Sequence, residues 1–336
     1  MNKGGRTLRA KLQDVAALAG VSVTTVSRVI NQKGYLSQQT IDKVHAAMKE
    51  LNYYPNSLAR SLQGKSTKLV GLIFPNIDTI FYAELVNHLE QILFAKGYKT
   101  IICNSERDAD KEAEYLNMLQ SNQVEGIIAG AHNLNYTDYE QVTAPVISFD
   151  RYIGENIPIV SSDNYLGGKL ATETLLKGQP TKPWMITGAN DPNSPTHLRY
   201  QAFMDVTKAH GLDGQITNIP KNFSQIRKQL IIKALLLEET PDAIFCSDDL
   251  TAMLVMNTAS ELGMIIPDDL KLVGYDGTDF IQTYVPQLTT IAQPIKDLAD
   301  LLVDVLLLQI DHSLEVKKDA DNRYVLPIKL IPGQTV

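Results

Sequence analysis

Apolar residues near the start of the chain recur three and four positions apart, the spacing of helices with one buried face. In the segment LQDVAALAGVSVTTVSRVIN, residues 12–31, two such stripes are separated by a turn. Gly20 suits the left-handed conformation that ends the first helix, and the Ser22 hydroxyl is placed to cap the second. The buried stripes are formed by Leu12, Val15, Ala16 and Ala19 and then by Val26, Val29 and Ile30.

The opposite face of the second predicted helix carries short, hydrogen-bonding side chains and one arginine. Such a narrow profile fits the major groove of DNA. An ordinary two-helix hairpin would show the same spacing, so the residues that follow decide between the two interpretations. The outer face is formed by Val23, Thr24, Ser27, Arg28 and Asn31.

A third helix is predicted to start at Ser37 and to be stopped by Pro55. Its buried stripe is Ile41, Val44, Met48 and Leu51. A seven-residue helix over 57–63 would follow, capped by Asn56 and ended by Gly64, with Ala59 and Leu62 at helical spacing. Isolated helices shorter than about 12–15 residues are marginal in water, so this segment is expected to be helical only when something else supports it.

The segment Gly64-Lys65-Ser66 resembles the end of a phosphate-binding loop. That motif needs a glycine five residues before Gly64, where this chain has Ala59. The sequence therefore excludes a phosphate loop here.

Beyond residue 68, short apolar runs alternate with amphipathic helices such as FYAELVNHLEQILFAKG. This alternation predicts parallel sheets covered on both faces by helices. Ligands bind at the carboxyl ends of strands in such sheets, and several runs here end in Asn or Asp. The strand-like runs are LVGLIFP, KTIICN, VEGIIAG, PVISFD, PWMITG, DAIFCSDD, LKLVGYDG and TTIAQP.

Charge is divided unevenly along the 336 residues, whose net charge is -7. Residues 1–68 hold eleven Lys and Arg against three acids, or +8, and the remainder holds 20 against 35, or -15. A basic head on an acidic body is typical of a nucleic-acid-binding protein with a separate regulatory domain.

The two cysteines, Cys103 and Cys246, each end an apolar run and lie far apart in sequence, which favours free thiols in a reducing compartment. Asp300 and Asp304 interrupt the longest apolar run, and the N-terminus lacks an apolar signal core. We therefore expect a cytoplasmic protein. The six dispersed His indicate no metal site, and no cofactor is expected.

The head and linker resemble the lactose/galactose-repressor family of bacterial transcription regulators. The matching residues are DVAALAGVSVTTVSRVIN, the third helix and PNSLARSLQGK. The resemblance implies a homodimer on a pseudo-palindromic operator, with Val23, Thr24 and Arg28 facing bases. It implies that Leu62 wedges into the minor groove, from a hinge helix that forms only on DNA and also carries Asn56 and Ala59. Phosphate contacts are expected from Ser22, Thr25, Ser27, Asn31 and Tyr35.

The body resembles the periplasmic-binding-protein-like core of the same family, an α/β fold of two parallel-sheet lobes behind an all-α helix-turn-helix head. The implied domains are 1–55 for the head, 56–68 for the hinge and 69–336 for the core. The first lobe takes about 69–162 plus 293–323, and the second about 163–292 plus 324–336. Residues at family cleft positions suit a carbohydrate, because carboxylates and Arg pair with neighbouring hydroxyls and aromatic rings cover a sugar face. They are Phe81, Tyr82, Arg107, Asp150, Arg199, Phe223, Asp248, Asp276 and Gln293.

Each cleft residue also has a structural interpretation. A strand-end Asp such as Asp150 or Asp248 is often a helix cap, and Phe81 and Tyr82 could be core residues at a helix start. Arg199, in the segment SPTHLR, is the cleft residue least open to such an interpretation. Arg107 and Arg199 together would favour a phosphorylated sugar.

Within the family, the phrases GLIFPNI, FYAEL, KTIICNSE, SSDNY, SDDLTA and GYDGT resemble sucrose operon repressors of Gram-positive bacteria. The alternative is a catabolite control regulator, which takes a phosphorylated carrier protein as corepressor. A departure from the family pattern at KGQPTKPW leaves the loop before the second lobe's first strand in doubt.

Two other classes fit less well. A secreted solute-binding protein would have no DNA-binding head and would carry a signal peptide. An enzyme acting on sugars would need catalytic groups. The chain has no G-x-S-x-G motif, and the neighbours Asp248 and Asp249 would point to opposite faces of one strand.

Overall fold

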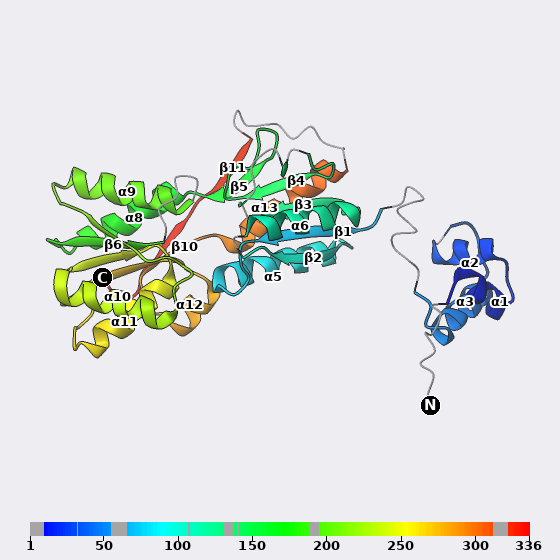
Figure 1. Ribbon diagram of the computed structural model, residues 1–336, viewed down its shortest axis with the longest axis horizontal. Coiled ribbons are helices and arrows are strands. Elements are labelled where there is room, and N and C mark those ends of the chain that lie inside the picture. Colours follow the sequence, from blue (N-terminus) through cyan, green and yellow to red (C-terminus); the bar gives the residue numbers. More distant parts are fainter. Residues whose placement is uncertain are drawn as a thin grey trace. The chain divides into compact units, whose positions relative to one another are not determined.

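The computed structural model describes residues 10–31, 33–54, 66–106, 108–130, 133, 138–139, 141–188, 195–311 and 322–336. It divides into two compact units, Met1–Thr67 and Lys68–Val336, which are described separately below (Figure 1). The predicted hinge helix over 57–63, with its cap Asn56, lies outside the described residues.

The first unit contains the three predicted helices, α1 (Leu12–Ala19), α2 (Val23–Ile30) and α3 (Gln38–Glu50). Gly20 ends α1 at φ +65°, a left-handed conformation that glycine takes without strain. The Ser22 hydroxyl accepts the Thr25 N–H at 3.1 Å and so caps α2. Val15, Val26 and Val44, one from each helix, are fully buried at the centre of the unit.

The end of α3 differs from the prediction. The helix stops at Glu50 instead of continuing to Pro55. Asn52 adopts φ +47°, and the Tyr53 N–H donates to the Met48 carbonyl at 2.8 Å. A left-handed residue after the last turn therefore ends the helix before the proline can.

The first lobe of the second unit is a six-stranded parallel sheet in the order β11-β5-β4-β3-β1-β2. Its helices are α5 (Ile80–Ala95), α6 (Ala109–Ser121) and α13 (Ile295–Ile310). The strands are β1 (Leu69–Phe74), β2 (Lys99–Asn104), β3 (Gly126–Ala129), β4 (Val146–Phe149), β5 (Ile159–Ser162) and β11 (Arg323–Leu326).

The second lobe is a six-stranded sheet in the order β12-β10-β9-β8-β6-β7, in which β12 pairs antiparallel to β10. Its strands are β6 (Pro183–Thr187), β7 (Gln215–Asn218), β8 (Ala243–Cys246), β9 (Lys271–Asp276), β10 (Thr290–Ala292) and β12 (Lys329–Ile331). Its helices are α8 (Asn164–Leu176), α9 (Pro195–Ala209), α10 (Gln225–Ala234) with the π-turn η1 (Leu235–Glu239), α11 (Asp249–Glu261) and α12 (Asp279–Tyr284).

The chain passes between the lobes three times, after β5, after β10 and after β11 (Figure 1). The last passage follows Leu326 and not residue 323 as predicted, because β11 pairs in parallel with β5 along its whole length. Each lobe is therefore built from separate stretches of chain.

The first lobe closes around α13, which enters it from the second lobe. Leu298, Leu302 and Leu306 on this helix are fully buried against α5 and the sheet. At about 1.5–3 kcal/mol for each fully buried leucine, this late segment contributes much of the stability of the first lobe.

Candidate functional site

A cavity of about 600 Å³ lies between the two lobes. Its walls come from the segments that follow β1 and β4 in the first lobe and β6, β7, β8 and β9 in the second. Both sheets thus direct the carboxyl ends of their strands toward the same space, as expected for a ligand site in α/β proteins. Eight of the nine predicted cleft residues line it, namely Phe81, Tyr82, Asp150, Arg199, Phe223, Asp248, Asp276 and Gln293. The ninth, Arg107, lies outside the described residues.

Arg199, in the second turn of α9, is 5% exposed, and hydrogen bonds, an ion pair and a ring contact fix its guanidinium. Its Nε donates to Asn164 Oδ1 at 2.9 Å, and an outer nitrogen donates to the Ser247 carbonyl at 2.7 Å. The same nitrogen lies 3.8 Å from Asp276 Oδ1, and the guanidinium covers the Tyr275 ring at 3.5 Å. This geometry presents one edge of a rigid, planar cation to the cavity.

Asp150 follows β4 and lines the cavity from the first lobe. Its Oδ1 accepts the Asn164 amide at 2.9 Å, and it caps no helix. Burial raises the pKa of Asp150 to about 7, against the opposing effects of Arg199 and the Asn164 hydrogen bond. The helix-cap interpretation of Asp150 is therefore wrong, and this carboxyl titrates near neutrality.

Asp276 ends β9 on the opposite wall. Its Oδ1 accepts the Gln293 amide at 2.8 Å, while Gln293 Oε1 accepts the Ser162 hydroxyl at 2.6 Å. Burial raises the pKa of Asp276 to about 6, although Arg199 opposes the shift. Gln293 and Ser162 stand on two of the passages between lobes, so the hydrogen bonds that hold this acid also join those two passages.

Both acids occupy unusual backbone conformations. Asp150 has φ +66° and Asp276 φ +109°. Residues other than glycine adopt such angles at a cost of about 1–3 kcal/mol each, and they concentrate at functional sites. The strain is retained here at the two carboxylates that flank Arg199.

Asp248 and Asp249 do not share a strand as predicted, because β8 ends at Cys246. Asp248 caps α11, accepting the Thr251 N–H at 2.8 Å while still lining the cavity. Asp249 accepts the Gly277 N–H at 2.7 Å and the Thr290 hydroxyl at 2.6 Å, and burial raises its pKa well above the usual range. The helix-cap interpretation of Asp248 is thus correct and compatible with a place in the cleft.

Aromatic rings form much of the first-lobe wall. Phe81 is 8% exposed and stacks on Phe149 at 6.0 Å between ring centroids, so it belongs to the core as well as to the cavity. Tyr82 packs edge-on against Phe81 at 5.5 Å. On the second lobe, Arg227 covers the Phe223 ring at 3.5 Å.

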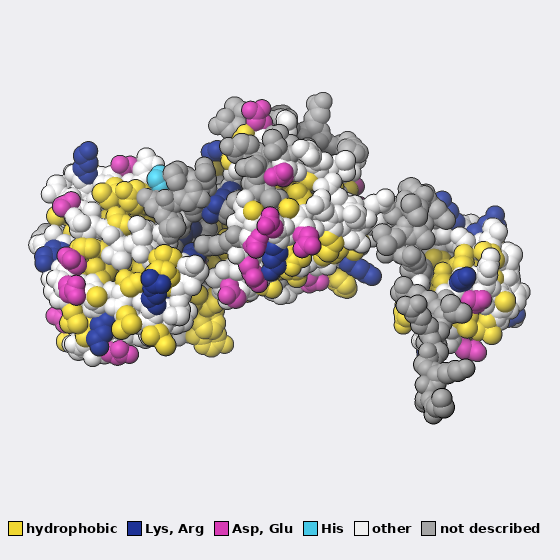
Figure 2. Space-filling view, in the orientation of Figure 1, with side chains coloured by type: hydrophobic (Ala, Val, Ile, Leu, Met, Phe, Trp, Pro, Cys, Tyr) yellow, Lys and Arg dark blue, Asp and Glu magenta, His cyan; other side chains and the backbone are white. Residues whose placement is uncertain are grey.

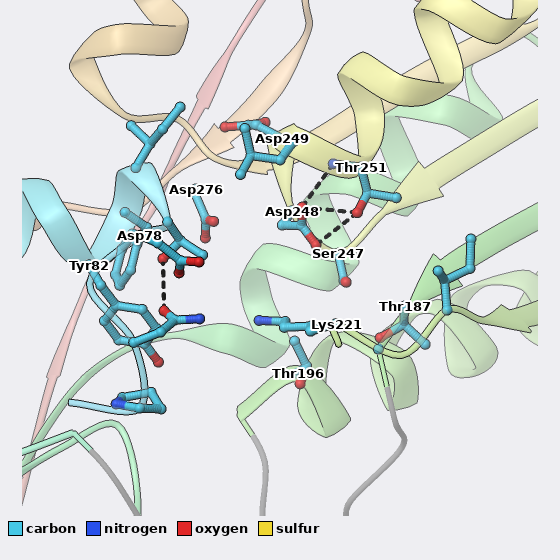
Figure 3. Close-up of a pocket in the computed structure, with 18 of the residues that line it drawn as sticks. Asp78, Tyr82, Thr187, Thr196, Lys221, Ser247, Asp248, Asp249, Thr251 and Asp276 are labelled. Atoms are coloured by element: carbon cyan, nitrogen blue, oxygen red, sulfur yellow. Dashed lines mark hydrogen bonds between the residues drawn. The ribbon is translucent and has the colours of Figure 1, made fainter. Parts of the chain in front are cut away.

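Several lining residues, among them Asp78, Thr196, Lys221 and Ser247, were not predicted from the sequence. Figure 3 shows Asp78 and Tyr82 on one wall, facing Lys221, Thr196 and Ser247 on the other. Lys221 extends into the cavity after β7 and lowers the pKa of Asp276 by its charge. Its position follows a short edge strand that the apolar pattern did not reveal. Figure 2 shows Lys and Arg side chains where the two lobes meet.

The lobes also touch outside the passages. The Asp279 N–H, in the first turn of α12, donates to the Glu84 carboxylate of α5 at 3.1 Å. Burial, and then the Asp279 charge, raises the pKa of Glu84. Any change in the angle between the lobes has to alter this contact.

The outer face of α2 carries short, exposed side chains and one arginine. Val23, Thr24 and Arg28 are exposed, and Val23 is 41% exposed despite being apolar. Ser27 and Asn31 are partly buried, and the Asn31 amide donates to the Ser27 carbonyl. Ser22 caps α2, Thr25 lies in its first turn, and Tyr35, between α2 and α3, is 99% exposed. Asn56, Ala59 and Leu62 lie outside the described residues.

Within the described ranges, no group of three or more His, Cys, Asp and Glu side chains could hold a metal ion. None of the helices in that part of the chain is long and apolar enough to cross a membrane. Both cysteines are free and buried, and burial raises the pKa of each thiol.

Comparison with known proteins supplies two family matches. Residues 11–56 match the model of bacterial regulatory proteins of the lacI family, and residues 173–336 match the periplasmic binding protein-like domain. A relative from Streptococcus mutans named as a sucrose operon repressor is 56% identical over 97% of this chain and 99% of its own length.

Two solved structures are similar in fold. A lac repressor dimer bound to operator and the anti-inducer ONPF is 26% identical, covers 98% of this chain and 99% of its own, and gives a TM-score of 0.80. A regulator from Alkaliphilus metalliredigens complexed with D-xylulofuranose is 31% identical, covers 80% of this chain and 99% of its own, and gives a TM-score of 0.72.

Proposed function

The chain belongs to the lacI family of bacterial regulatory proteins, and on that premise we propose that it represses a sugar-utilisation operon, that of sucrose. Its head binds operator DNA, and the cavity between its lobes binds a sugar that changes operator affinity. The observation that carries this proposal is the pairing, in one chain, of an exposed groove-sized helix face with a cleft of carboxylates, Arg199 and aromatic rings. The name of the Streptococcus mutans relative supports sucrose as the operon's sugar.

The operator is a pseudo-palindrome read by a homodimer, with half-sites about 10 base pairs apart. Val23, Thr24 and Arg28 contact base edges, and Arg28 pairs with a guanine. Arg28→Ala should cost about 1–3 kcal/mol at one base position and relax the preference there. Lys49→Ala, which removes a charge near the end of α3, should leave base preference unchanged. If Arg28→Ala discriminates between operator and mutated operator as well as the wild type does, the assignment is wrong.

The hinge segment completes the DNA interface, with Leu62 as the minor-groove wedge. Leu62→Ala should weaken specific operator binding and leave sugar affinity unchanged. Amide exchange over 57–63 should slow when operator is added to the free protein. Equal protection with and without operator would contradict folding of this helix on DNA.

The effector is a sugar or a sugar phosphate. The cavity of about 600 Å³ lies within the roughly 300–1,000 Å³ of small-molecule sites. A carboxylate and a guanidinium set side by side make paired hydrogen bonds to neighbouring hydroxyls, and the Phe81 and Tyr82 wall suits the apolar face of a ring. The Alkaliphilus metalliredigens regulator, which is complexed with D-xylulofuranose, supports a sugar as the class of effector.

Coupling between sugar and DNA requires two states of the lobes. A sugar that closes the cleft would reorient the lobes and, in a dimer, change the spacing of the two linkers. The hinge helices could then no longer pair, and operator affinity would change. The same motion would change the hydrogen bond between the Asp279 N–H and the Glu84 carboxylate.

Calorimetric titration of sucrose, fructose and their phosphate esters, with and without operator, tests the proposal directly. We expect one of these sugars to bind and to change operator affinity, and the direction of change distinguishes inducer from corepressor. Arg199→Ala should lose sugar binding. Wild-type sugar affinity in that variant would remove the cleft assignment.

The chain acts as a regulator and not as an enzyme. The Asp248 carboxylate accepts a hydrogen bond from Thr251, and the Asp249 carboxylate accepts hydrogen bonds from Gly277 and Thr290. The two carboxylates are therefore not arranged as a catalytic acid and base. Incubation with sucrose should therefore yield no hydrolysis. Binding of a phosphorylated carrier protein without any response to sugars would favour the catabolite control alternative instead.

A further inference from the structure

Asn164 stands at the start of α8, directly after the chain's first passage between the lobes. It does not line the cavity, and its side chain is 2% exposed. An amide buried this deeply needs hydrogen-bond partners, since leaving its donor and acceptor unpaired costs about 1–3 kcal/mol. Two of its three partners, Asp150 and Arg199, are groups proposed to hold the sugar.

The amide bonds in three directions. Its Nδ2 donates to Asp150 Oδ1 at 2.9 Å and to the Ser162 carbonyl at 3.2 Å. Its Oδ1 accepts from Arg199 Nε at 2.9 Å. The opposite orientation of the amide would set two donors against each other at Arg199 and two acceptors against each other at Asp150, so these partners fix it.

The partners come from different lobes. Asp150 follows β4 of the first lobe, whereas Arg199 belongs to α9 of the second. In this conformation of the lobes, Asn164 thus joins the carboxylate to the guanidinium across the cleft. A preformed pair loses little conformational entropy on binding, which is how positioning residues raise affinity.

We propose that Asn164 is a positioning residue for the effector, which holds Asp150 and Arg199 as a ready-made pair for two neighbouring hydroxyls of the sugar. The identification of the ligand as a sugar rests on the proposed function. The placement of Asp150 and Arg199 by Asn164 does not depend on it. The positioning role makes effector affinity depend on a side chain that never touches the effector.

The proposal has a proton-linked signature. The charged and titratable groups around Asp150 are Arg199 from α9, Arg151 from its own loop, and Asp276 and Tyr275 from β9. Burial raises the pKa of Asp150 to about 7, and the Asn164 hydrogen bond is among the interactions that lower it. Losing that donor should therefore raise the pKa of Asp150 further. An ionised carboxylate accepts from both sugar hydroxyls, whereas a protonated one loses an acceptor.

Wild-type affinity for the bound sugar should accordingly fall by roughly tenfold or more from pH 8 to pH 6, as Asp150 and then Asp276 take up protons. Asn164→Asp is the sharpest variant, because it keeps the shape and the acceptor for Arg199 but sets an acceptor against Asp150. We expect its affinity to lie about fivefold or more below wild type at pH 7, with the midpoint of its affinity–pH profile above that of wild type. A side chain with a merely structural role would lower affinity equally at every pH.

Asn164→Ser serves as the second variant, since it removes the amide without adding charge and should shift the same profile in the same direction. Asn87→Asp, at an exposed position on α5, is the matched control and should follow the wild-type profile. Trp184 fluorescence and circular dichroism would establish that each variant is folded.

The titration of the Asp150 carboxyl itself, followed by ¹³C NMR without ligand, separates the two proposals. A midpoint that rises in Asn164→Asp and Asn164→Ser supports the positioning role whatever the ligand is. If that midpoint rises and no sugar binds at any pH, the proposed function fails and the placement stands. If sugar binds and neither the midpoint nor the affinity profile moves in the variants, the inference about Asn164 is overturned.

Discussion

Replacement of Asp150 by asparagine should make the second unit more stable at neutral pH while it weakens sugar binding. The substitution removes a partly buried charge and keeps the size of the side chain. The amide oxygen of the new side chain could still accept from Asn164, and asparagine tolerates the φ of +66° better than most residues. The change therefore tests the charge of this site with little change in its shape.

The magnitude follows from the shift in the pKa of Asp150, from 3.8 to about 7. At about 1.36 kcal/mol per unit this shift is worth about 4 kcal/mol, and solvent at the partly exposed carboxyl reduces the figure to about 2–4 kcal/mol. Because the folded-state pKa is raised, the stability linked to the proton is fully present below pH 3.8 and is lost as pH rises through 7. Wild type should lose this free energy of unfolding over that window, and Asp150→Asn should not.

Urea unfolding followed by the fluorescence of Trp184, on β6 of the second unit, measures the difference between pH 5 and pH 8.5. The gap between variant and wild type should widen with pH and level off above about pH 8, with the variant the more stable. Asp300→Asn, at an exposed aspartate on α13, should show no such gap. A variant that is no more stable than wild type at pH 8, or a gap that does not vary with pH, would refute the reasoning.

Three further predictions concern other parts of the chain. Ser22→Ala removes the cap of α2 and should lower the free energy of unfolding of the head by about 1 kcal/mol, seen as faster amide exchange in α2; unchanged exchange would contradict the capping role. Gly277→Ala should destabilise the second unit by about 3 kcal/mol or more in a thermal melt, because Gly277 has φ +56° and an added Cβ would overlap the Cα atom of Ala292. The control Gly263→Ala should cost about 1 kcal/mol in the same melt, because no atom lies within 4 Å of its Cβ. Cys103 and Cys246 should resist a thiol reagent at pH 8 until urea unfolds the chain, because both thiols are buried. Burial raises the pKa of Cys103 to about 11 and that of Cys246 well above its usual range, which keeps them in the unreactive thiol form. Rapid labelling of the folded protein would contradict this prediction.

The sequence predicted the elements in which apolar pattern and local chemistry agree. The helices of the head were located by their buried stripes and by Gly20, Ser22 and Ser37, each of which acts locally. Eight strands were visible as apolar runs. The other four strands of the described residues were not: β5 has only two apolar residues before Ser161 and Ser162, and β7, β11 and β12 carry partly exposed or exposed residues at the edges of their sheets.

The cleft residues, like the strands, were predicted where a local pattern marks them and missed where none does. Asp150, Asp276 and Gln293 end strands, so topology brings them together and the family likeness could name them. Asn164 and Lys221 gave no such signal, because their importance arises from contacts between distant segments. The Asn164 contact to Arg199 spans 35 positions, and the Ser162–Gln293 bond spans 131. No local pattern encodes such separations.

The three passages between the lobes also govern how the protein is made. Each sheet has an edge strand, β11 or β12, that is translated only after residue 322, and the first lobe receives its buried helix α13 only after most of the second lobe has been synthesised. The apolar surface that α13 covers is therefore exposed on the nascent chain while residues up to 294 emerge. Such a chain cannot complete one lobe and then the other, as proteins of contiguous domains do. Neither sheet is complete until its edge strand has been translated, and a chain that stops before Arg323 would lack an edge strand in both.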